Sequence, residues 1–564
     1  MSATQQFLAA RDYLLEHRAD CDGACRDFRW PVLQEFNWVR DFFDTIADRE
    51  DRIALRVVAD GAPDQTRTFS QLCFRSRQAA SLLRDHGVGA GDRVLVMLGN
   101  VVPLWEVMLG VMRLGGIIIP ATTLLREEEL ADRLQRGGVR AVVTHADLAG
   151  RFASLLSREV RIGVGADTPA GWLDFAKESA AASPHFEPAV ATRAADPLFL
   201  YFTSGTTARP KLVAHTQASY PVGSLSTLYW LGLKPGDVHL NLSSPGWAKH
   251  AWSSLFAPWN AEATVVAYHY ERFQPRALLE QLVRCRVTSF CAPPTVWRWL
   301  IQEPLRDWPV CLRELVSAGE PLNPQVIARV QAAWNLTIRD GYGQTETTAV
   351  IGNPPGQPLK AGSMGRPLPG YPVVLLNPDG ELQRDDGEIC LDLRAGRPAG
   401  LMAGYVDGQG SLLDAACNGY FHTGDVASRD AEGYLVYVGR MDDVFKCSDY
   451  RISPFELESV LIAHEAVAEA AVVPSPDPLR GAIPKAFITL AAGQNADAAT
   501  ARSIFRFVRE RVAPYKRIRR LEFRDLPKTI SGKIRRSDLR RDELVAVGAG
   551  SRANEFLEDD SLSA

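Results

Sequence analysis

Short apolar segments alternate with amphipathic segments along most of the chain, and this alternation constrains the fold more than any other feature. "DRVLVML" and "GIIIPA" have the composition of buried strands, and "PLWEVMLGVMRLG" between them has apolar residues at helical spacing. The same order recurs after Asp196, where strands such as "LFLYFT" alternate with helices such as "QPRALLEQLVRC". Alternation of this kind produces βαβ units. We therefore predict an α/β protein whose large N-terminal domain has two α/β subdomains with mostly parallel sheets.

The sequence pattern changes at about Leu368. After this residue, short segments of alternating polarity are separated by Gly and Pro, which is typical of a small, distorted antiparallel β-barrel. After Gly439 the pattern is that of a compact α+β unit. At 564 residues the chain is long enough for several such units. We predict an N-terminal domain at 1–439 with its β-rich part at about 365–439, a hinge at 440–442, a C-terminal domain at 443–546 and a disordered tail at 547–564.

Composition excludes several classes of function. The 63 Lys and Arg against 67 Asp and Glu give a net charge of −4, so nucleic acid is not expected as a partner. The N-terminus lacks an apolar signal core and no apolar stretch could span a bilayer, so we expect a cytoplasmic protein without a membrane span. Of nine cysteines only Cys21 and Cys25 are close in sequence, and no second pair or His cluster completes a zinc motif, so we expect free thiols.

The loop "YFTSGTTARPK" follows an apolar strand and is rich in hydroxyl groups. A loop of hydroxyls and backbone amides with one lysine suits a polyphosphate, because each phosphate oxygen needs hydrogen-bond donors. The spacing is not that of a Walker loop, and a Ser/Thr-rich surface turn is the alternative. The candidate phosphate ligands are Thr203, Ser204, Gly205, Thr206, Thr207 and Lys211.

Four motifs, in the same order, resemble those of the adenylate-forming superfamily, which includes acyl-CoA synthetases, luciferases and nonribosomal peptide adenylation domains. They are the loop above, "DGYGQTETT", "YFHTGDVASRDAEGYLVYVGRMDD" and "LPKTISGKIRR". One departure is Ala208, where the family usually has Gly. The resemblance covers nearly the whole chain, and "GSMGRPLPGYPV" and "SPFELESVL" are most similar to the medium-chain acyl-CoA synthetases.

The resemblance implies a two-step reaction that uses ATP, Mg²⁺ and CoA. A carboxylate attacks the α-phosphorus of ATP, which gives an acyl-AMP and pyrophosphate, and the thiol of CoA then displaces AMP. The expected protein is thus an ATP-dependent carboxylate–CoA ligase for a medium-chain, branched or aromatic acid. The alternatives are an acyl-AMP ligase with a carrier protein or another acceptor, and a non-catalytic nucleotide-binding regulator; a homodimer is left open.

The resemblance also implies roles for individual residues. Lys211 and the loop 203–207 would hold the β- and γ-phosphates, Glu346 would bind Mg²⁺, and Thr345 would donate to the α-phosphate. Lys533 would bridge the carboxylate and the α-phosphate as charge grows in the transition state. Taken singly, each of these could be an ordinary core or surface residue. The other implied nucleotide-binding positions are Gly319, Glu320, Pro321, Asp340, Gly341, Tyr342, Gly343, Gln344, Asp425 and Arg440.

The stretch "SSPGWAKHAWSSLFAPW" lies where the family lines its acyl pocket. Two alternatives stand for His250, which could contact the carboxylate or cap a helix. The candidate pocket residues are Trp247, His250, Trp252, Gly343 and Val350.

The family rotates its C-terminal domain between the two steps, and Asp442 matches the pivot position. Ser448, Asp449, Tyr450 and Arg451 would then face CoA. Most relatives have Gly where this chain has Asp449, so two interpretations are open. In one, only the backbone of Asp449 lines the thiol path, because Asp tolerates unusual backbone angles; in the other, its side chain alters the entry of the acceptor.

Overall fold

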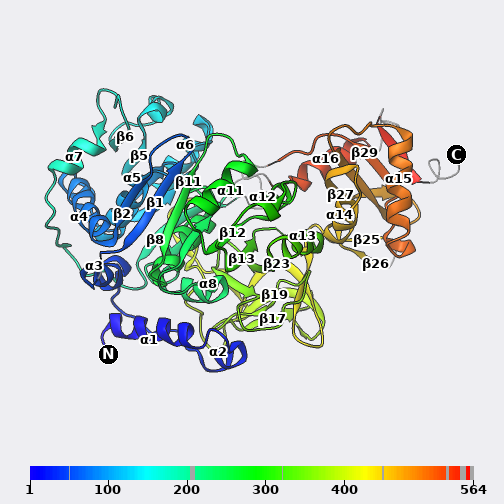
Figure 1. Cartoon of the computed structure of the whole chain (residues 1–564), viewed down its shortest axis with the longest axis horizontal. Helices are drawn as coiled ribbons and strands as arrows, with labels where there is room; N and C mark the ends of the chain where they lie inside the picture. Colours follow the sequence, from blue (N-terminus) through cyan, green and yellow to red (C-terminus); the bar gives the residue numbers. More distant parts are fainter. Residues whose placement is uncertain are drawn as a thin grey trace. The chain divides into compact units, whose positions relative to one another are not determined.

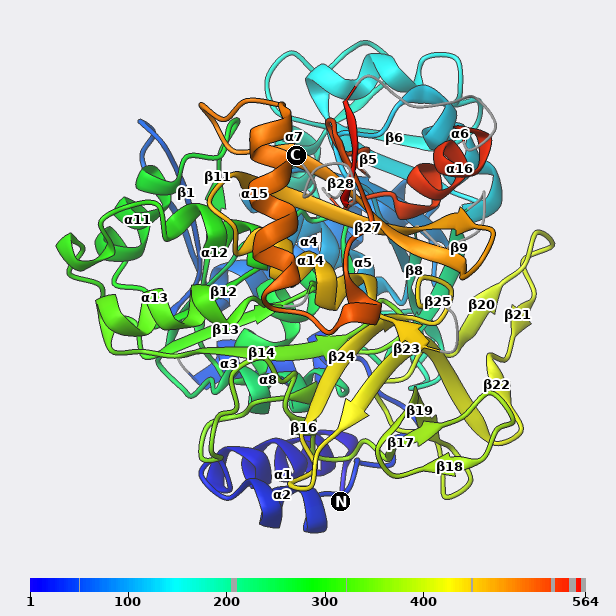
Figure 2. The same cartoon turned by 90° about the vertical axis from the view of Figure 1, so that its right-hand side faces the viewer.

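The computed structural model describes residues 1–49, 51–203, 210–320, 322–447, 450–528, 533–546 and 554–558. The chain divides into two compact units (Figures 1 and 2). The first comprises Met1–Val373 and Leu391–Phe421, and the second comprises Val374–Cys390 and His422–Ala564. The predicted hinge at 440–442 between an N-terminal and a C-terminal domain stays a prediction.

The first unit contains a nine-stranded sheet in the order β16-β15-β14-β13-β12-β10-β11-β1-β2. All pairs from β14 to β1 are parallel, as the near-continuous apolar strands predict. The strands are β1 (Ile53–Ala59), β2 (Gln65–Thr68), β10 (Val238–Asn241), β11 (Thr264–His269), β12 (Ser289–Ala292), β13 (Glu314–Ala318), β14 (Ile338–Gly343), β15 (Ala349–Gly352) and β16 (Arg366–Pro367).

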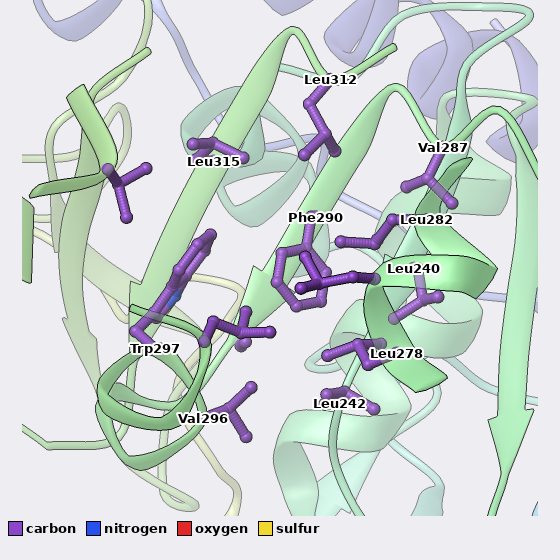
Figure 3. Close-up of a cluster of buried hydrophobic side chains, with 14 of the residues drawn as sticks. Leu240, Leu242, Leu278, Leu282, Val287, Phe290, Val296, Trp297, Leu312 and Leu315 are labelled. Atoms are coloured by element: carbon purple, nitrogen blue, oxygen red, sulfur yellow. The ribbon is translucent and has the colours of Figure 1, made fainter. Parts of the chain in front are cut away.

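One face of this sheet packs against helices in a buried apolar cluster (Figure 3). Leu240 and Phe290 come from neighbouring parallel strands, and Leu278 and Leu282 come from helix α11 (Pro275–Arg284). Trp297 of α12 (Pro294–Leu300) has no exposed surface. Burial of such side chains contributes about 1.5–3 kcal/mol each, so this cluster fixes the strands whose ends carry the candidate site.

A second nine-stranded sheet in this unit has the order β21-β20-β9-β8-β4-β3-β5-β6-β7. It is parallel from β8 to β7, while β9 and β20 add antiparallel strands beside β8. The strands are β3 (Arg93–Met97), β4 (Ile117–Pro120), β5 (Ala141–His145), β6 (Val160–Val164), β7 (Leu173–Asp174), β8 (Pro197–Thr203), β9 (Lys211–Thr216), β20 (Gly404–Val406) and β21 (Leu412–Leu413).

Helices cover both sheets of the first unit, as the βαβ pattern predicts. They are α1 (Ala3–Glu16), α2 (Cys21–Asp27), η1 (Val39–Phe43), α3 (Asp44–Arg49), α4 (Phe69–Asp85), α5 (Val102–Leu114), α6 (Glu127–Gly137), η2 (Ala146–Phe152), α7 (Phe175–Ala181), α8 (Ser224–Leu231), α9 (Ala248–Ala251), η3 (Trp252–Phe256), α10 (Ala257–Asn260), η4 (Leu305–Asp307) and α13 (Pro324–Trp334), besides α11 and α12.

A third sheet has the order β18-β17-β19-β23-β22, with β24 paired to β23, and the pairs β17–β18, β22–β23 and β23–β24 are antiparallel. Its strands are β17 (Val373–Leu376), β18 (Leu382–Gln383), β19 (Asp386–Asp392), β22 (Ala416–Cys417), β23 (Tyr420–Arg429) and β24 (Leu435–Arg440). Most of it belongs to the second unit, which means that the β-rich part groups with the C-terminal residues rather than with the α/β sheets.

The rest of the second unit is an α+β fold. A hairpin of β25 (Phe445–Cys447) and β26 (Tyr450–Ile452) precedes a four-stranded sheet in the order β27-β28-β29-β30. The other elements are α14 (Pro454–Ile462), β27 (Val467–Asp477), β28 (Gly481–Leu490), α15 (Ala498–Arg509), η5 (Pro514–Lys516), β29 (Arg520–Phe523), α16 (Arg536–Ala546) and β30 (Glu555–Leu557).

The expected disordered tail from 547 is wrong for residues 554–558. Strand β30 pairs with β29 there, and Glu555 forms an ion pair with the buried Lys485 at 2.7 Å. Phe556 packs against Phe523 with the ring centroids 5.5 Å apart. The polar composition of this segment predicted disorder. Its backbone pairing with β29, the ion pair of Glu555 and the packing of Phe556 nevertheless add it to the sheet as a strand.

The predicted fold class is confirmed, with mostly parallel α/β sheets in the first unit and α+β structure at the C-terminus. Among the described residues, none of the helices combines the length and the apolar composition that a bilayer crossing needs.

Candidate functional site

The predicted phosphate loop joins two paired strands. Thr203 ends β8, Lys211 begins β9, and the two residues are direct partners across the antiparallel pair. The strands therefore hold the two ends of the loop together. Ser204, Gly205, Thr206 and Thr207 lie outside the described residues, as does Pro321.

Lys211 and Glu346 are linked by Tyr405, which the sequence did not single out. The Nζ of Lys211 lies 4.8 Å from the centroid of the Tyr405 ring, and the Tyr405 hydroxyl donates to Oε1 of Glu346 at 3.0 Å. Tyr405 is on β20, which pairs with β9. A cation, a ring and a carboxylate from three segments thus lie together, which is an arrangement suited to a phosphate with its cation.

The backbone at Thr345 is fixed by two further residues that sequence reasoning missed. The carbonyl of Thr345 accepts hydrogen bonds from Nε2 of His215 at 2.7 Å and from the Tyr220 hydroxyl at 3.2 Å. Burial lowers the pKa of His215 to about 3. The ring is therefore neutral, with its proton on Nε2, and Nδ1 accepts from the Ser219 hydroxyl at 2.9 Å. A histidine inside the apolar strand "KLVAHT" was the available signal.

The predicted walls of the adenine site lie at one edge of the sheet. β13 and β14 are parallel neighbours, with Ala318 opposite Gly341, so Gly319 and Tyr342 follow at the same carboxyl ends. Gly319 has φ of +108°, which favours glycine. A side chain at Gly343 would meet the carbonyl oxygen of Thr348 at 2.2 Å. Glu320 accepts from Thr295 Oγ1 at 3.3 Å, while Tyr342 and Gln344 are half-buried.

Asp340 is buried rather than presented to a ligand. Burial raises its pKa to about 7, although the amide of Gly341 donates to its carboxylate at 2.9 Å and stabilises the ionised form. Its carbonyl accepts from Nε1 of Trp230 at 3.2 Å, and a side chain at Gly341 would collide with the same indole. We therefore interpret Asp340 and Gly341 as positioning residues beneath the site.

The predicted acyl segment folds as a helix with a π-helical turn in its middle, α9, η3 and α10. Such turns frequently occur at functional sites. Lys249 donates to the carbonyl of Ala318 at 3.3 Å, which joins this helix to the end of β13. Trp252 lies 6.0 Å from Trp230 between ring centroids. Trp247 is half-buried at the N-cap of α9, and Val350 is fully buried on β15.

His250 is 2% exposed, and neither of its ring nitrogens has a hydrogen-bond partner among the described residues. The predicted alternative of a helix cap is wrong, because the imidazole forms no hydrogen bond to a backbone group of the described residues. The ring lies 5.6 Å from that of Trp105, whose Nε1 donates to the carbonyl of Ser254 at 2.9 Å. Burial lowers the pKa of His250 to about 3, so the imidazole is neutral and offers one donor and one acceptor.

Asn241 has another buried polar atom of this kind, and it contacts the helical segment that follows His250. Asn241 ends β10 and donates to Oγ of Ser254 at 3.0 Å, but its Oδ1 has no partner in the described part of the chain. Buried polar groups are nearly always hydrogen-bonded. The imidazole of His250, without a partner among the described residues, is therefore a candidate contact for a polar group of a ligand.

In the second unit, the carboxylate of Asp425, the predicted ribose-binding residue, contacts the side chains of Arg440 and Tyr437. Asp425 and Arg440 are direct partners across β23 and β24, with Oδ1 and NH1 3.5 Å apart. The hydroxyl of Tyr437 donates to the same Oδ1 at 3.1 Å. Asp425 is 4% exposed. Tyr437 was not predicted, although it follows the strand alternation in "GYLVYVGR".

The predicted catalytic lysine and the hinge belong to the same unit. Lys533 is exposed, one residue before Ile534, which forms a bridge with Lys528. Asp442 is exposed, and its carbonyl accepts from Arg540. Tyr450 stacks on Tyr515 at 4.1 Å between centroids. Ser448 and Asp449 lie outside the described residues, and only the backbone of Arg451 is described.

The chain matches two protein-family models and several known proteins. The family model described as AMP-binding enzyme matches residues 42–406, and that described as AMP-binding enzyme C-terminal domain matches 456–533. The chain is 43% identical over 526 residues to 4-hydroxybutyrate–CoA ligase 1 of Metallosphaera sedula, covering 91% of each chain. It is 36% identical over 541 residues to the mitochondrial acyl-coenzyme A synthetase ACSM3 of Mus musculus, covering 93% of each.

Two solved structures have the same fold. One is an anthranilate CoA ligase in complex with anthranoyl-AMP, with a TM-score of 0.82, 28% identity and coverage of 92% of this chain and 99% of that one. The other is a benzoate CoA ligase from Burkholderia xenovorans, with a TM-score of 0.77, 29% identity and coverage of 90% and 100%.

Proposed function

The chain belongs to the AMP-binding enzyme family and is an AMP-forming acid–CoA ligase, and on this premise we propose that its acid carries a hydroxyl or a similar hydrogen-bonding group. The observation that carries the proposal is the buried, neutral imidazole of His250, which has no hydrogen-bond partner among the residues that the structure describes. A neutral imidazole has one donor and one acceptor, which complements a hydroxyl. A carboxylate anion needs two donors.

The ring of Trp105 lies 5.6 Å from that of His250 and gives this part of the acyl segment an apolar side. The name of the Metallosphaera sedula relative, a ligase of a hydroxy acid, supports this class of substrate. The names of the anthranilate and benzoate ligases support an aromatic acid as the second candidate, for which Trp247, Trp252 and Trp105 offer stacking surfaces. Branched and unsubstituted medium-chain acids complete the panel to be tested.

We propose the following roles in the adenylation step. Lys211 and the loop 203–207 bind the β- and γ-phosphates, and Thr345 donates to the α-phosphate, held in place by His215 and Tyr220. Asp425, oriented by Tyr437 and Arg440, accepts from the ribose hydroxyls. Lys533 stabilises the charge that develops between the two anionic reactants, because preorganised donors supply the largest share of such catalysis.

Mg²⁺ fits the residues present. The half-buried carboxylate of Glu346, oriented by the Tyr405 hydroxyl, is one hard oxygen ligand, and phosphate oxygens supply others in sites of this kind. When bound, the ion would neutralise phosphate charge. We propose Glu346 as its protein ligand.

CoA rather than a carrier protein is the acceptor that the names of the relatives support. The pivot at Asp442 and contacts of CoA with residues 448–451 stay proposals, as do the cytoplasmic location, with a mitochondrial one as the alternative that the Mus musculus relative suggests, and a homodimer.

The substitution His250→Phe tests the substrate class. It keeps a ring against Trp105 but removes both polar nitrogens. We expect kcat/KM for a hydroxylated acid to fall by about tenfold to a hundredfold relative to the unsubstituted acid of the same length. The reason is that a site which hydrogen-bonds a substrate hydroxyl distinguishes the two acids by that bond, and the substitution removes it. The KM for ATP serves as the control and should stay unchanged. If the ratio of kcat/KM between the two acids is the same in His250→Phe and in the parent, the hydroxyl-binding role of His250 is rejected.

A further inference from the structure

A cluster of a thiol, an imidazole and a carboxylate lies on the third sheet, apart from the residues assigned above. Glu388 and Cys390 are two positions apart on β19, so their side chains share one face, and His422 comes from the neighbouring β23. Nδ1 of His422 lies 3.5 Å from Sγ of Cys390 and 2.8 Å from Oε2 of Glu388. These three ligand atoms all lie within 4.8 Å of one another.

We propose that Glu388, Cys390 and His422 form a binding site for Zn²⁺. Zinc prefers thiolate, imidazole and carboxylate ligands in tetrahedral arrangement, and bonds of about 2.3 Å to sulfur and about 2.0–2.1 Å to nitrogen place those two atoms about 3.5 Å apart. The sulfur–nitrogen separation here already has this value. Oε2 of Glu388 would move away from Nδ1 of His422 by about half an ångström when the ion replaces the proton that these two atoms share.

Burial and anchoring favour an ordered site with one open position. Cys390 is fully buried and the Glu388 side chain is 8% exposed, while that of His422 is 36% exposed. The second oxygen of Glu388 accepts from the amide of Gly424 at 2.8 Å, which orients the carboxylate. Three protein ligands with a fourth position toward the exposed side are the pattern of an accessible zinc site rather than of a closed structural one.

The other candidate groups among the described residues do not match this one. Glu522, Glu543 and Glu555 also converge, but the ammonium of Lys485 already fills their centre, with contacts of 2.7–2.9 Å. Cys21 and Cys25 lie 4.0 Å apart between sulfur atoms on α2, and this pair offers only two soft ligands.

The site is mechanically connected to Asp425. His422 and Asp425 lie on one strand, and Thr423 between them donates to the carbonyl of Ile389 at 2.7 Å, while its Oγ1 accepts from the amide of Asp425 at 3.1 Å. A shift of Glu388 and His422 onto an ion therefore moves the backbone that presents Asp425. This consequence rests on the proposed role of Asp425 in ribose binding, and it predicts that bound zinc weakens the binding of ATP.

The test is a competition between the full-length protein and a chromogenic zinc chelator, made in a Cys21→Ser/Cys25→Ser background so that the helix pair cannot contribute. We expect one Zn²⁺ per chain, and His422→Asn and Cys390→Ser should each weaken it at least tenfold. Cys417→Ser, which removes an exposed thiol on β22, is the matched control and should leave binding unchanged. Equal affinity in His422→Asn and the parent would overturn the proposal, as would a Co²⁺-loaded protein without a thiolate charge-transfer band.

The effect on ATP is measured separately, by calorimetric ATP titration of chains that hold one equivalent of Zn²⁺ or none. We expect a raised Kd for ATP in the zinc-loaded parent and no change in His422→Asn. Zinc binding without any change in the Kd for ATP would overturn the coupling to Asp425. Because the chelator competition does not depend on catalysis, failure of the zinc site and failure of the proposed function give different results.

Discussion

Replacement of Lys533 by alanine should slow acyl-AMP formation by about a hundredfold to a thousandfold, the usual cost of one preorganised donor at a transition state. The same variant should convert a supplied acyl-AMP to the CoA thioester at nearly the normal rate. Two anions meet in the first step, so the loss of a positive charge is felt most there.

The measurements are single-turnover rates for each half-reaction. Lys528→Ala is the matched control, because Lys528 lies in the same basic segment but forms an ion pair with Glu469 at 2.7 Å. Loss of this partly exposed pair should cost little in either step. Equal slowing of both half-reactions by Lys533→Ala would contradict the assigned role.

Replacement of Lys485 by methionine should destabilise the second unit by about 3–5 kcal/mol, because removal of one partner from a buried charge cluster leaves uncompensated charge. The side chain of Lys485 has no exposed surface, and its ammonium contacts Glu522, Glu543 and Glu555 at 2.7–2.9 Å. Arg520 alone would remain to hold Glu555, at 2.9 Å, and strand β30 should detach.

The change is measurable unit by unit. All twelve Trp residues of the chain precede residue 335, so Trp fluorescence reports only on the first unit. Hydrogen exchange of the β27–β29 amides under increasing urea reports on the second. Lys516→Met is the control, since its pair with Glu456 is partly exposed and should contribute at most about 1 kcal/mol. Unchanged exchange in Lys485→Met would contradict the account of this cluster.

The same cluster predicts a pH dependence. Burial by itself would raise the pKa of Glu555, but hydrogen bonds from Lys485 and Arg520 bring it below its ordinary value. Its stabilising contribution is therefore present above the ordinary pKa of a glutamate and is lost as the pH falls below it. The protection factors of the β29 amides, which are corrected for the pH dependence of intrinsic exchange, should accordingly fall on acidification before those of the first unit.

Periodicity along the chain was sufficient to predict the sheets and most helices, because buried parallel strands need continuous apolar runs. It failed where two similar residues compete. Helix α4, for example, has both Thr68 and Ser70 at its start, and the structure caps it with Thr68, because Gln71 three residues later completes a capping box with Thr68. Strand β30 was not predicted, because its pairing depends on partners far away in the sequence, such as Lys485.

The candidate site was predictable only where a motif is contiguous. Thr345, Glu346 and Asp425 come from short recognisable segments. Tyr405, His215 and Tyr437 act on them from other segments, and nothing local marks a tyrosine on β20 as the partner of Glu346. The proposed zinc site was not predicted from the sequence for the same reason. Cys390 and His422 lie 32 positions apart in the sequence and are brought together by the pairing of neighbouring strands.

The most direct test of the account is the exchange of labelled pyrophosphate into ATP, measured over carboxylic acids matched in chain length with and without a hydroxyl group. We predict exchange that requires the acid, that is fastest with a hydroxylated acid, and that is accompanied by AMP and an acyl-CoA thioester once CoA is added. Absence of exchange with every acid, or release of ADP instead of AMP, would contradict it.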